Sequence, residues 1–426
     1  MEARLSRRRG WALALAATFT MSISYVDRQT FAILAPTITM ALAISEVQFG
    51  WLGSAFALAY LVGAPLSGRL VDRVGARRAL VVAVLVWSIV AALHSVAMGF
   101  VSLVLLRIAL GLAESPSFPG AAQTVHRALP PDERPRGFGV LFTGSSIGAM
   151  LAAPLASRLE GAFGWRPATV VTAIFGLIWI PIWIAVAFGR KSREVLDRRE
   201  PAVAEVRVSP WAILGHRAVV RAIVLVIASA PFINLVLNWG AKLLAREHHV
   251  AQSHMGDYLW LPPILFDIGA VVFGDLATRH ARKTNGAPAK KLVFVAMLLA
   301  TTVAAIPFAT GPWGVAGSAA IAMAGGGALY ALLTADMLAR VPPDAVSTAG
   351  GITAAAQSIA QIVVNPLIGA AVERFGSYAV PSVALAIWVV PGTLYWILSA
   401  APAVHEERVV ALAAMPSHAH RGGDCP

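Results

Sequence analysis

The segment GRLVDRVGARR, residues 68–78, places one aspartate and four arginines between two long apolar runs. Its glycines predict a close approach of helices, and its charges predict a short loop at a membrane surface. Residues 269–283, GAVVFGDLATRHARK, repeat this arrangement in the second half of the chain, where Asp275, Arg279 and Arg282 follow another apolar run. Such a duplication is typical of membrane proteins that are built from two repeated halves.

The composition also places the chain among polytopic membrane proteins. Of its 426 residues, 58% are hydrophobic and 13% are charged, and the mean hydropathy is +0.71, which is too apolar for a soluble domain of this length. The net charge of +12 falls in short clusters between apolar runs instead of on one face, which argues against a nucleic-acid partner. The single cysteine, Cys425, excludes a disulfide framework and a cysteine-based metal site.

Apolar runs that are long enough to cross a bilayer of about 30 Å occur twelve times, six in each half of the chain. The first follows the basic N-terminus MEARLSRRRG and is longer than the apolar region of a signal peptide, so we expect a retained helix. The predicted spans are residues 11–40, 46–68, 78–98, 100–125, 136–158, 165–189, 218–245, 255–278, 291–310, 312–338, 346–372 and 378–400.

The distribution of basic residues predicts the orientation of these spans. If both termini lie on one side, that side receives 27 of the 34 Lys and Arg residues. Four fall on the opposite side, namely Arg158, Arg166, Arg246 and Arg374, and three lie within spans, namely Arg28, Arg107 and Lys242. Because basic residues are enriched in cytoplasmic loops, we expect a multi-pass protein of the inner or plasma membrane with both termini in the cytoplasm.

The sequence therefore predicts an all-α polytopic membrane protein with twelve transmembrane helices in two pseudo-symmetric six-helix bundles. The N-terminal bundle is expected at residues 1–189 and the C-terminal bundle at 218–400. The charged stretch between them, residues 190–217, is predicted to be a cytoplasmic linker, and residues 401–426 a cytoplasmic tail.

Two charges interrupt the fourth apolar run, in the segment RIALGLAESPSFP at residues 107–119. Arg107 and Glu114 are seven residues apart, so they share one face of a helix at a separation of about 10 Å along its axis. Charged residues within a span are costly and usually mark a functional site. Pro116 and Pro119 are expected to loosen the helix directly after Glu114.

These motifs resemble a known family. GRLVDRVGARR is similar to the loop 2/3 signature of the major facilitator superfamily. YVDR at residues 25–28, the 107–119 segment and GWRPATVVTAIFGLIW at 164–179 resemble its anion:cation symporter branch, which includes hexuronate, galactonate and aldarate importers and vesicular organic-anion carriers. Two features depart from that pattern: NWGAKLL at 238–244 lacks the usual proline and contains Lys242, and the eighth span contains Asp267.

Two carboxylates are candidates for proton coupling, because burial in a low-dielectric cavity favours the protonated form of such a group. Glu114 is the first, and the resemblance implies proton binding there. An ion pair with Arg107 that never changes protonation is the alternative for Glu114. Asp27 is the second candidate, or else it holds a neighbouring helix. Asp27 and Arg28 are adjacent, so their side chains diverge by about 100° and serve different partners.

The candidate substrate ligands in the first half are two arginines and two tyrosines. Arg28 offers a permanently charged planar fork that suits a carboxylate, and the resemblance implies that it binds the substrate anion. Arg107 either anchors Glu114 or shares the anion. Tyr25 lies on the same face of its helix as Arg28, and Tyr60 matches a family tyrosine near the substrate. For both tyrosines the alternative is a hydroxyl that is satisfied within the core.

In the second half, Gln357, Gln361 and Asn365 form a polar stripe at i, i+4 and i+8 of one helix. The two glutamines are predicted to contact substrate, and hydrogen bonding between helices is the alternative. Asn238 and Trp239 are similar candidates. Lys242 either extends the anion site or pairs with Asp267. We expect Thr143, Ser145 and Ser146, in the glycine-rich FTGSSIG segment, to serve close packing.

The two repeated loops are predicted to act in conformational change or gating. The residues concerned are Gly68, Asp72, Arg73, Gly75, Arg77 and Asp275. The triplet His248, His249 and His254 has no clear further ligand, so we expect no metal site.

As a whole, the sequence predicts a secondary active transporter that moves an organic anion, a sugar acid or another carboxylate, by proton-coupled symport and alternating access. The alternatives are a proton-coupled exporter or antiporter of small molecules and, from a different class, a membrane sensor that does not transport. No nucleophile–base pair is recognisable, so we expect no enzymatic activity and no cofactor. The expected partners are the anion, the proton and the lipid bilayer, and we expect a monomer.

Overall fold

Long apolar helices make up most of the chain in the computed structural model, which describes residues 5–197, 210–284, 286–342 and 345–400. The first half contains α1 (Arg7–Ile33), α2 (Ala35–Ala41), α3 (Glu46–Val74), α4 (Ala76–Leu93), the short helix η1 (His94–Val96), α5 (Phe100–Glu114), α6 (Ser117–Ala128), α7 (Arg134–Phe163), α8 (Trp165–Ala187) and α9 (Arg190–Leu196). Each of the first six predicted spans corresponds to one long helix or to two helices joined end to end.

The second half repeats this pattern. It contains α10 (Pro210–Leu214), α11 (Arg217–Asn234), η2 (Leu235–Trp239), α12 (Gly240–His248), η3 (Gln252–His254), α13 (Gly256–Leu259), α14 (Leu261–Lys283), α15 (Lys290–Ala300), η4 (Thr301–Phe308), α16 (Gly311–Arg340), α17 (Val346–Phe375) and α18 (Ala379–Leu398). Among the described residues, eleven helical segments are long and apolar enough to span a membrane. The twelfth long helix, α1, has 27 residues and is less apolar because it contains Asp27, Arg28, Gln29 and several hydroxyl side chains.

Local sequence signals fix several helix ends. Ser45 begins α3 with a capping box: its hydroxyl accepts the backbone N–H of Gln48, and the Gln48 side chain accepts the backbone N–H of Ser45. Gly75 ends the same helix with φ of 86°, a left-handed conformation that glycine adopts without steric cost. The turn in the 68–78 segment therefore depends on Gly75. Gly68 differs from the prediction, because nothing lies within 4 Å of the position of an added Cβ, so it allows no close helix approach here.

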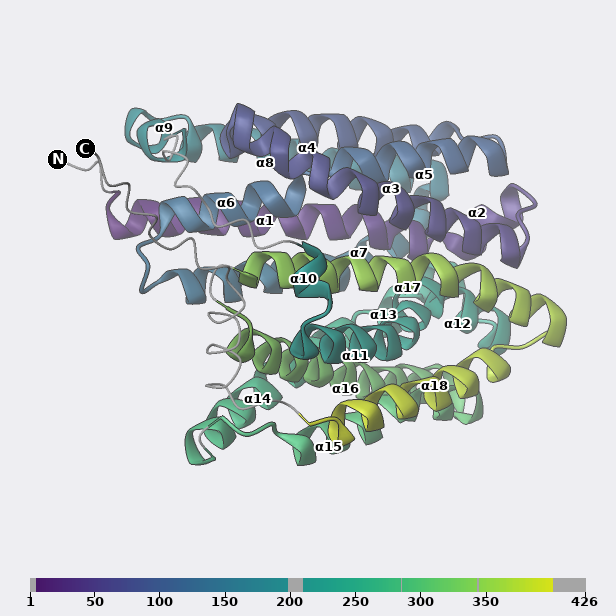
Figure 1. Ribbon diagram of the computed structural model, residues 1–426. Helices are drawn as coiled ribbons and strands as arrows, with labels where there is room; N and C mark the ends of the chain where they lie inside the picture. Colours follow the sequence, from purple (N-terminus) through teal and green to yellow (C-terminus); the bar gives the residue numbers. More distant parts are fainter. Residues whose placement is uncertain (1–4, 198–209, 285, 343–344, 401–426) are drawn as a thin grey trace, which may run out of the picture.

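The helices form two bundles (Figure 1). Helices α1 and α3–α8 pack against one another, and α11 and α14–α18 form a second group. The main contacts between the groups join α3 to α17 and α7 to α13 and α14. From the predicted linker, α9 packs on α6 and α8, and α10 packs on α11 and α17. Residues 198–209 of that linker and the predicted tail lie outside the described residues.

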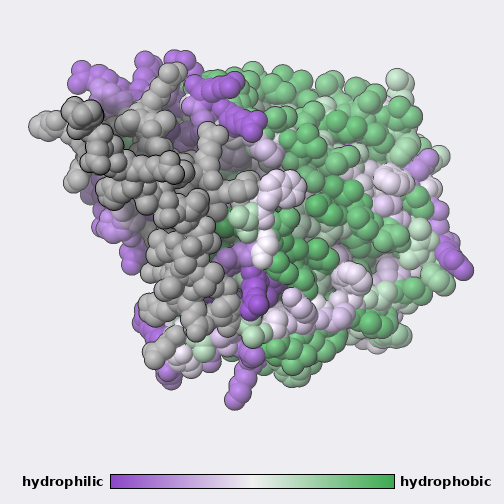
Figure 2. Space-filling view, in the orientation of Figure 1, coloured by the Kyte–Doolittle hydropathy of each residue, from purple (hydrophilic) through white to green (hydrophobic). Residues whose placement is uncertain are grey.

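The surface consists of a broad apolar belt between two hydrophilic edges (Figure 2). In Figure 1, α1 begins and α18 ends toward the same side of the molecule, where α9 also lies. We call this the terminal side and the opposite one, where α2 ends, the far side. Hydrophilic residues gather on the terminal side, as the predicted distribution of basic loops requires.

The bundles approach each other most closely on the far side. An added Cβ at Gly50 or Gly369 would lie closer than 3.0 Å to backbone atoms of the other bundle, at Asn365 and Glu46 respectively. On the terminal side the helices leave space, because an added Cβ at Gly139 or Gly350 would have no atom within 4 Å. At these positions, the close contacts between the bundles therefore lie on the far side.

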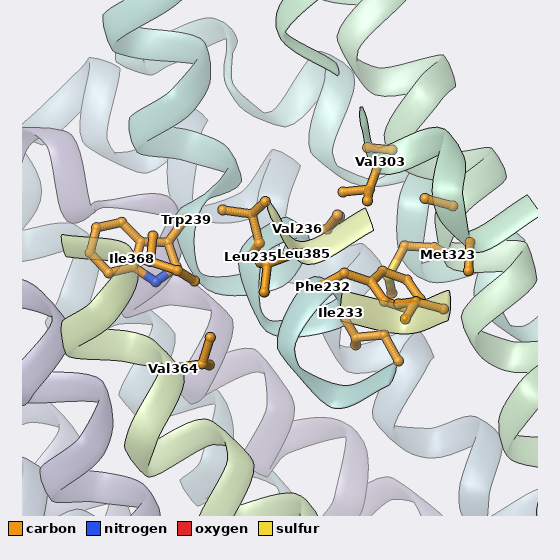
Figure 3. Close-up of a cluster of buried hydrophobic side chains, with 14 of the residues drawn as sticks. Phe232, Ile233, Leu235, Val236, Trp239, Val303, Met323, Val364, Ile368 and Leu385 are labelled. Atoms are coloured by element: carbon orange, nitrogen blue, oxygen red, sulfur yellow. The ribbon is translucent and has the colours of Figure 1, made fainter. Parts of the chain in front are cut away.

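The helix formed by α11 and α12 changes its winding near its middle. Residues Leu235–Trp239 form a π-helix, a rare feature that is often found at functional sites. Figure 3 shows Leu235, Val236 and Trp239 of this segment, with Phe232 and Ile233 of the preceding turn, in a buried cluster. The π-helix shares Asn238 and Trp239 with the stretch whose sequence departs from the family pattern.

Candidate substrate and proton site

An ion pair between Arg28 of α1 and Glu114 of α5 lies at the centre of the N-terminal bundle. Arg28 Nε donates to Glu114 Oε2 at 2.6 Å, and Ser24 Oγ donates to the same oxygen at 2.8 Å. The Glu114 side chain is fully buried, whereas that of Arg28 is 18% exposed. Among the described residues, Glu114 Oε1 and Arg28 Nη2 have no hydrogen-bond partner. The guanidinium thus retains a donor for a second anion.

Three aromatic rings surround the same guanidinium. The Arg28 Cζ atom lies 5.0 Å from the ring centre of Tyr25, 4.9 Å from that of Phe56 and 4.6 Å from that of Tyr60. Cation–π contacts of this kind hold a cation in place without neutralising its charge. Tyr25 and Tyr60, both predicted as substrate ligands, therefore lie beside Arg28, and both residues are partly exposed.

Asp27 of α1 and Arg107 of α5 line a separate cavity. The cavity has a volume of about 20 Å³, enough for one water molecule, and it is lined by Asp27, Thr30, Phe31, Ala91, His94, Arg107, Leu110, Thr169 and Thr172. Both carboxylate oxygens of Asp27, and Nε and Nη1 of Arg107, are buried without a hydrogen-bond partner in the described part of the chain. Arg107 packs instead on the rings of Phe31 and Phe56, at 4.1 and 5.0 Å.

The helix breaks directly after Glu114, as the two prolines predicted. Helix α5 ends at Glu114, and α6 begins at Ser117 with Pro116 as its N-cap. The Ser115 hydroxyl compensates by donating to the carbonyl of Leu112 at 2.7 Å. The proposed proton-binding carboxylate therefore lies at a helix end whose backbone is only partly paired.

The polar residues of the second half divide into two groups. Asn238, Gln357 and Gln361 are partly exposed, as a ligand contact requires. Trp239 is fully buried, and its Nε1 donates to Asn365 Oδ1 at 3.1 Å. Asn234, which sequence reasoning did not select, donates to the same oxygen at 2.8 Å and accepts from Asn238. Trp239 and Asn365 thus join helices in this structure.

Lys242 and Asp267 do not pair with each other, although the sequence left that option open. Lys242 Nζ lies 3.0 Å from Glu46 Oε2 and donates to Thr39 at 2.9 Å, and Arg246 contacts Glu46 at 3.5 Å. This group links the two bundles on the far side. Asp267 instead accepts a hydrogen bond from Ser146. Both contacts involve segments so distant in sequence that spacing could not reveal them.

The predicted gating residues differ between the two repeated loops. Arg77 is buried and bonds to Asp197, just after α9, at 3.2 and 2.5 Å, and Asp72 accepts from Gln123 at 2.9 Å. Arg73 is exposed, and Asp275 forms only an exposed pair with Arg279 at 2.7 Å. The loop of the N-terminal half is thus tied to the linker helix by Arg77.

Sequence reasoning missed several residues of the site. Ser24 precedes Arg28 by four residues and Phe56 precedes Tyr60 by four, so helical spacing from known candidates could have found both. His94 and Glu46 gave no such signal, since each meets its partners only through tertiary packing. His94 contributes a buried Nε2 without a hydrogen-bond partner among the described residues.

The chain is similar to known membrane transporters. The chain is 29% identical over 290 residues to a hexuronate transporter of Bacillus subtilis, covering 66% of this chain and 68% of that one. It is 25% identical over 418 residues to a D-galactonate transporter of Escherichia coli, covering 93% and 96%. A bacterial homologue of the human lysosomal transporter Spinster, solved in an inward-facing and unoccupied conformation, has a TM-score of 0.76 at 18% identity and covers 92% and 97%.

These relatives are transporters, not enzymes, and they confirm the resemblance that the sequence motifs indicated. The sequence pattern of the Major Facilitator Superfamily matches residues 17–364, most of the chain and parts of both bundles. With its two helical bundles and a paired charge inside one of them, the chain belongs to the Major Facilitator Superfamily.

Proposed function

We propose that the protein is a proton-coupled symporter of a sugar acid or a similar carboxylate. The observation that supports this most directly is the Arg28–Glu114 pair, because one partly exposed guanidinium is held by one fully buried carboxylate. The names of the relatives, which include hexuronate and D-galactonate, indicate the class of anion.

Coupling follows from competition for Arg28. While Glu114 is ionised, its carboxylate occupies Arg28 Nε at 2.6 Å. Protonation removes the negative charge and weakens that bond, so the substrate carboxylate becomes the better partner for the guanidinium. Loss of the proton restores Glu114 as partner and expels the substrate. Binding of the proton and of the anion therefore favour each other.

A second carboxylate and a second cation, Asp27 and Arg107, extend the same balance of charge. Phe56 contacts both guanidinium groups, with Arg28 at 4.9 Å and Arg107 at 5.0 Å from its ring. Two cations and two carboxylates give zero net charge when both acids are ionised. Each proton taken up adds one positive charge to a site of low dielectric constant, which favours entry of one anion. Asp27 thus serves as the second proton site.

The orientation follows from the basic residues. The terminal side is the cytoplasmic side, and the close contacts at Gly50 and Gly369 join the bundles on the opposite, far side. Release to the cytoplasm occurs in this state. Rocking of the bundles, residues 1–189 against 218–400, then closes the terminal side and opens the far side by alternating access.

Purified protein in liposomes tests the proposal. With an inside-alkaline pH gradient, D-galactonate or a hexuronate is expected to accumulate above its external concentration, and a proton ionophore is expected to abolish the accumulation. The pH gradient alone, without added sodium, should suffice. Absence of flux for every sugar acid would contradict the proposed function.

The far-side charge group gives a separate prediction. Replacing Glu46 by glutamine removes the carboxylate that pairs with Lys242 and Arg246 and leaves Lys242, 7% exposed, without a counter-ion. Breaking a buried pair in this way costs about 3–5 kcal/mol, so the population open on the far side should rise at least about tenfold. Spin-label distances between the far-side ends of α3 and α17, after replacement of Cys425, measure the shift.

Glu160→Gln is the matched control for this experiment. Glu160 also lies on the far side and accepts a hydrogen bond from Thr37 at 3.2 Å, but both residues belong to the N-terminal bundle. Its replacement should leave the distances unchanged. Equal distance distributions in the Glu46 variant and the unmodified protein would show that the charge group does not hold the far side closed.

A further inference from the structure

Asp267 is a carboxylate at the boundary between the bundles, and neither proton coupling nor anion binding uses it. It lies on α14, and its Oδ1 accepts a hydrogen bond from Ser146 Oγ of α7 at 2.7 Å. The side chain is half-buried. In the part of the chain that the structure describes, no cation pairs with it, and no other hydrogen bond reaches it. It therefore keeps acceptor capacity for a ligand.

Packing places this carboxylate near the depth of the Arg28 guanidinium. Ser146 lies between Gly144 and Gly148, and an added Cβ at Gly148 would lie closer than 3.0 Å to Ser22 and Tyr25 of α1. The guanidinium of Arg28 packs on the Tyr25 ring, and Arg28 and Ser24 both donate to Glu114. The two groups are thus within about one helical turn, roughly 5 Å, of the same level along α1.

A second polar group of the C-terminal bundle, Tyr330, packs against the residue that precedes Asp267. The ring of Tyr330, on α16, packs on Phe266 with 6.0 Å between ring centres. Its hydroxyl is buried and has no hydrogen-bond partner among the described residues. A molecule that spans the two bundles at this level therefore meets a cation on one bundle and hydrogen-bonding oxygens, one of them anionic, on the other.

We infer that Asp267 selects monocarboxylates that have a hydrogen-bond donor, a hydroxyl or an ammonium, at the end remote from the carboxylate, and that it rejects dicarboxylates. This inference rests on the proposed binding of the anion by Arg28. An ionised carboxylate only accepts hydrogen bonds, so it favours a donor. A second carboxylate on the substrate would face it as a like charge in a partly desolvated site, which opposes binding.

D-Galactonate and galactarate test this directly, because they share one six-carbon skeleton and differ only in a hydroxyl or a carboxylate at C6. Calorimetry with the purified protein at one fixed pH should show galactonate binding at least about 30-fold more tightly than galactarate. In Asp267→Asn the ratio should fall to about threefold or less, mainly because galactarate gains affinity. 6-Amino-6-deoxygalactonate then distinguishes a hydroxyl donor from an ammonium donor at C6. If it binds more tightly than galactonate, and if Asp267→Asn removes that difference, the preferred donor is an ammonium.

Ser146→Ala is the matched control, because it removes the hydrogen bond between the bundles and leaves the carboxylate in place. It should preserve the preference for galactonate. If Asp267 only joins the bundles, both variants will change the affinities for the two acids by the same factor, and the selectivity assigned here is wrong. Equal affinity of the unmodified protein for the two acids would also overturn it. Absence of binding and of flux for every sugar acid would instead show that the proposed function itself fails.

Discussion

Glu114→Gln is expected to abolish accumulation driven by a pH gradient while the protein still exchanges substrate across the membrane. Glutamine cannot ionise, so it cannot return to compete for Arg28 when the proton leaves. The hydrogen bond between Arg28 Nε and a carboxylate at 2.6 Å is charge-assisted, and its loss should raise affinity for the anion at neutral pH about tenfold or more. Counterflow and gradient-driven uptake in the same liposomes measure the two activities separately.

The pH dependence gives a second measurement of the same variant. In the unmodified protein, affinity should rise as the pH falls, because protonation of Glu114 releases Arg28. The glutamine variant should lose most of this dependence and retain only what Asp27 contributes. Ser24→Ala is the control: it removes the other hydrogen bond to Glu114 Oε2, at 2.8 Å, and keeps the titrating group. Unchanged gradient-driven accumulation in Glu114→Gln would remove this residue from proton coupling.

Arg28→Ala is expected to lower affinity for the anion at least about 30-fold, since truncating one partner of a desolvated charge pair typically costs about 2–5 kcal/mol. It also leaves Glu114, which is fully buried, without its cation. Arg28→Lys keeps the charge and loses the planar fork, so we expect an intermediate loss. Thermal shift and calorimetry at low pH, where Glu114 does not compete, give the affinities.

Arg190→Ala controls for the loss of an arginine as such. Arg190 is 90% exposed on α9, and its pair with Glu194 at 3.7 Å is far from the site in sequence and structure. Its replacement should leave affinity unchanged. If Arg28→Ala binds the substrate as tightly as the unmodified protein, the anion is held elsewhere, and Arg107, whose Nε and Nη1 are buried without partners among the described residues, becomes the next candidate.

The sequence predicted the helices well because a bilayer imposes a minimum length of apolar residues that few other structures share. The predicted span at 346–372, for example, corresponds to α17, Val346–Phe375. Interruptions were harder to predict. Pro116 predicted the break after α5. Nothing in the sequence LVLNW predicted the π-helix at Leu235–Trp239, because winding of this kind depends on tertiary packing.

The candidate site was predictable in its residues and less so in its pairing. Arg107 and Glu114 share a helix face, yet about 10 Å along the axis is too far for an ion pair, and Arg28 reaches Glu114 from another helix. Lys242 forms an ion pair with Glu46 of the other bundle. Ser146, which was expected to serve only close packing, donates a hydrogen bond to Asp267. Periodicity places residues on a face of one helix, but it contains no information on which helix lies opposite.

The close backbone contacts at Gly50 and Gly369 have a consequence for control of the carrier. Both glycines let one bundle touch the backbone of the other on the far side, and neither contacts Arg28 or Glu114. A methyl group at either position would therefore push the two bundles apart on the far side and destabilise the state that is closed there. It would change no charge and no ligand-binding side chain. The resting preference between the two states of the carrier can thus be tuned independently of how tightly the carrier holds its cargo.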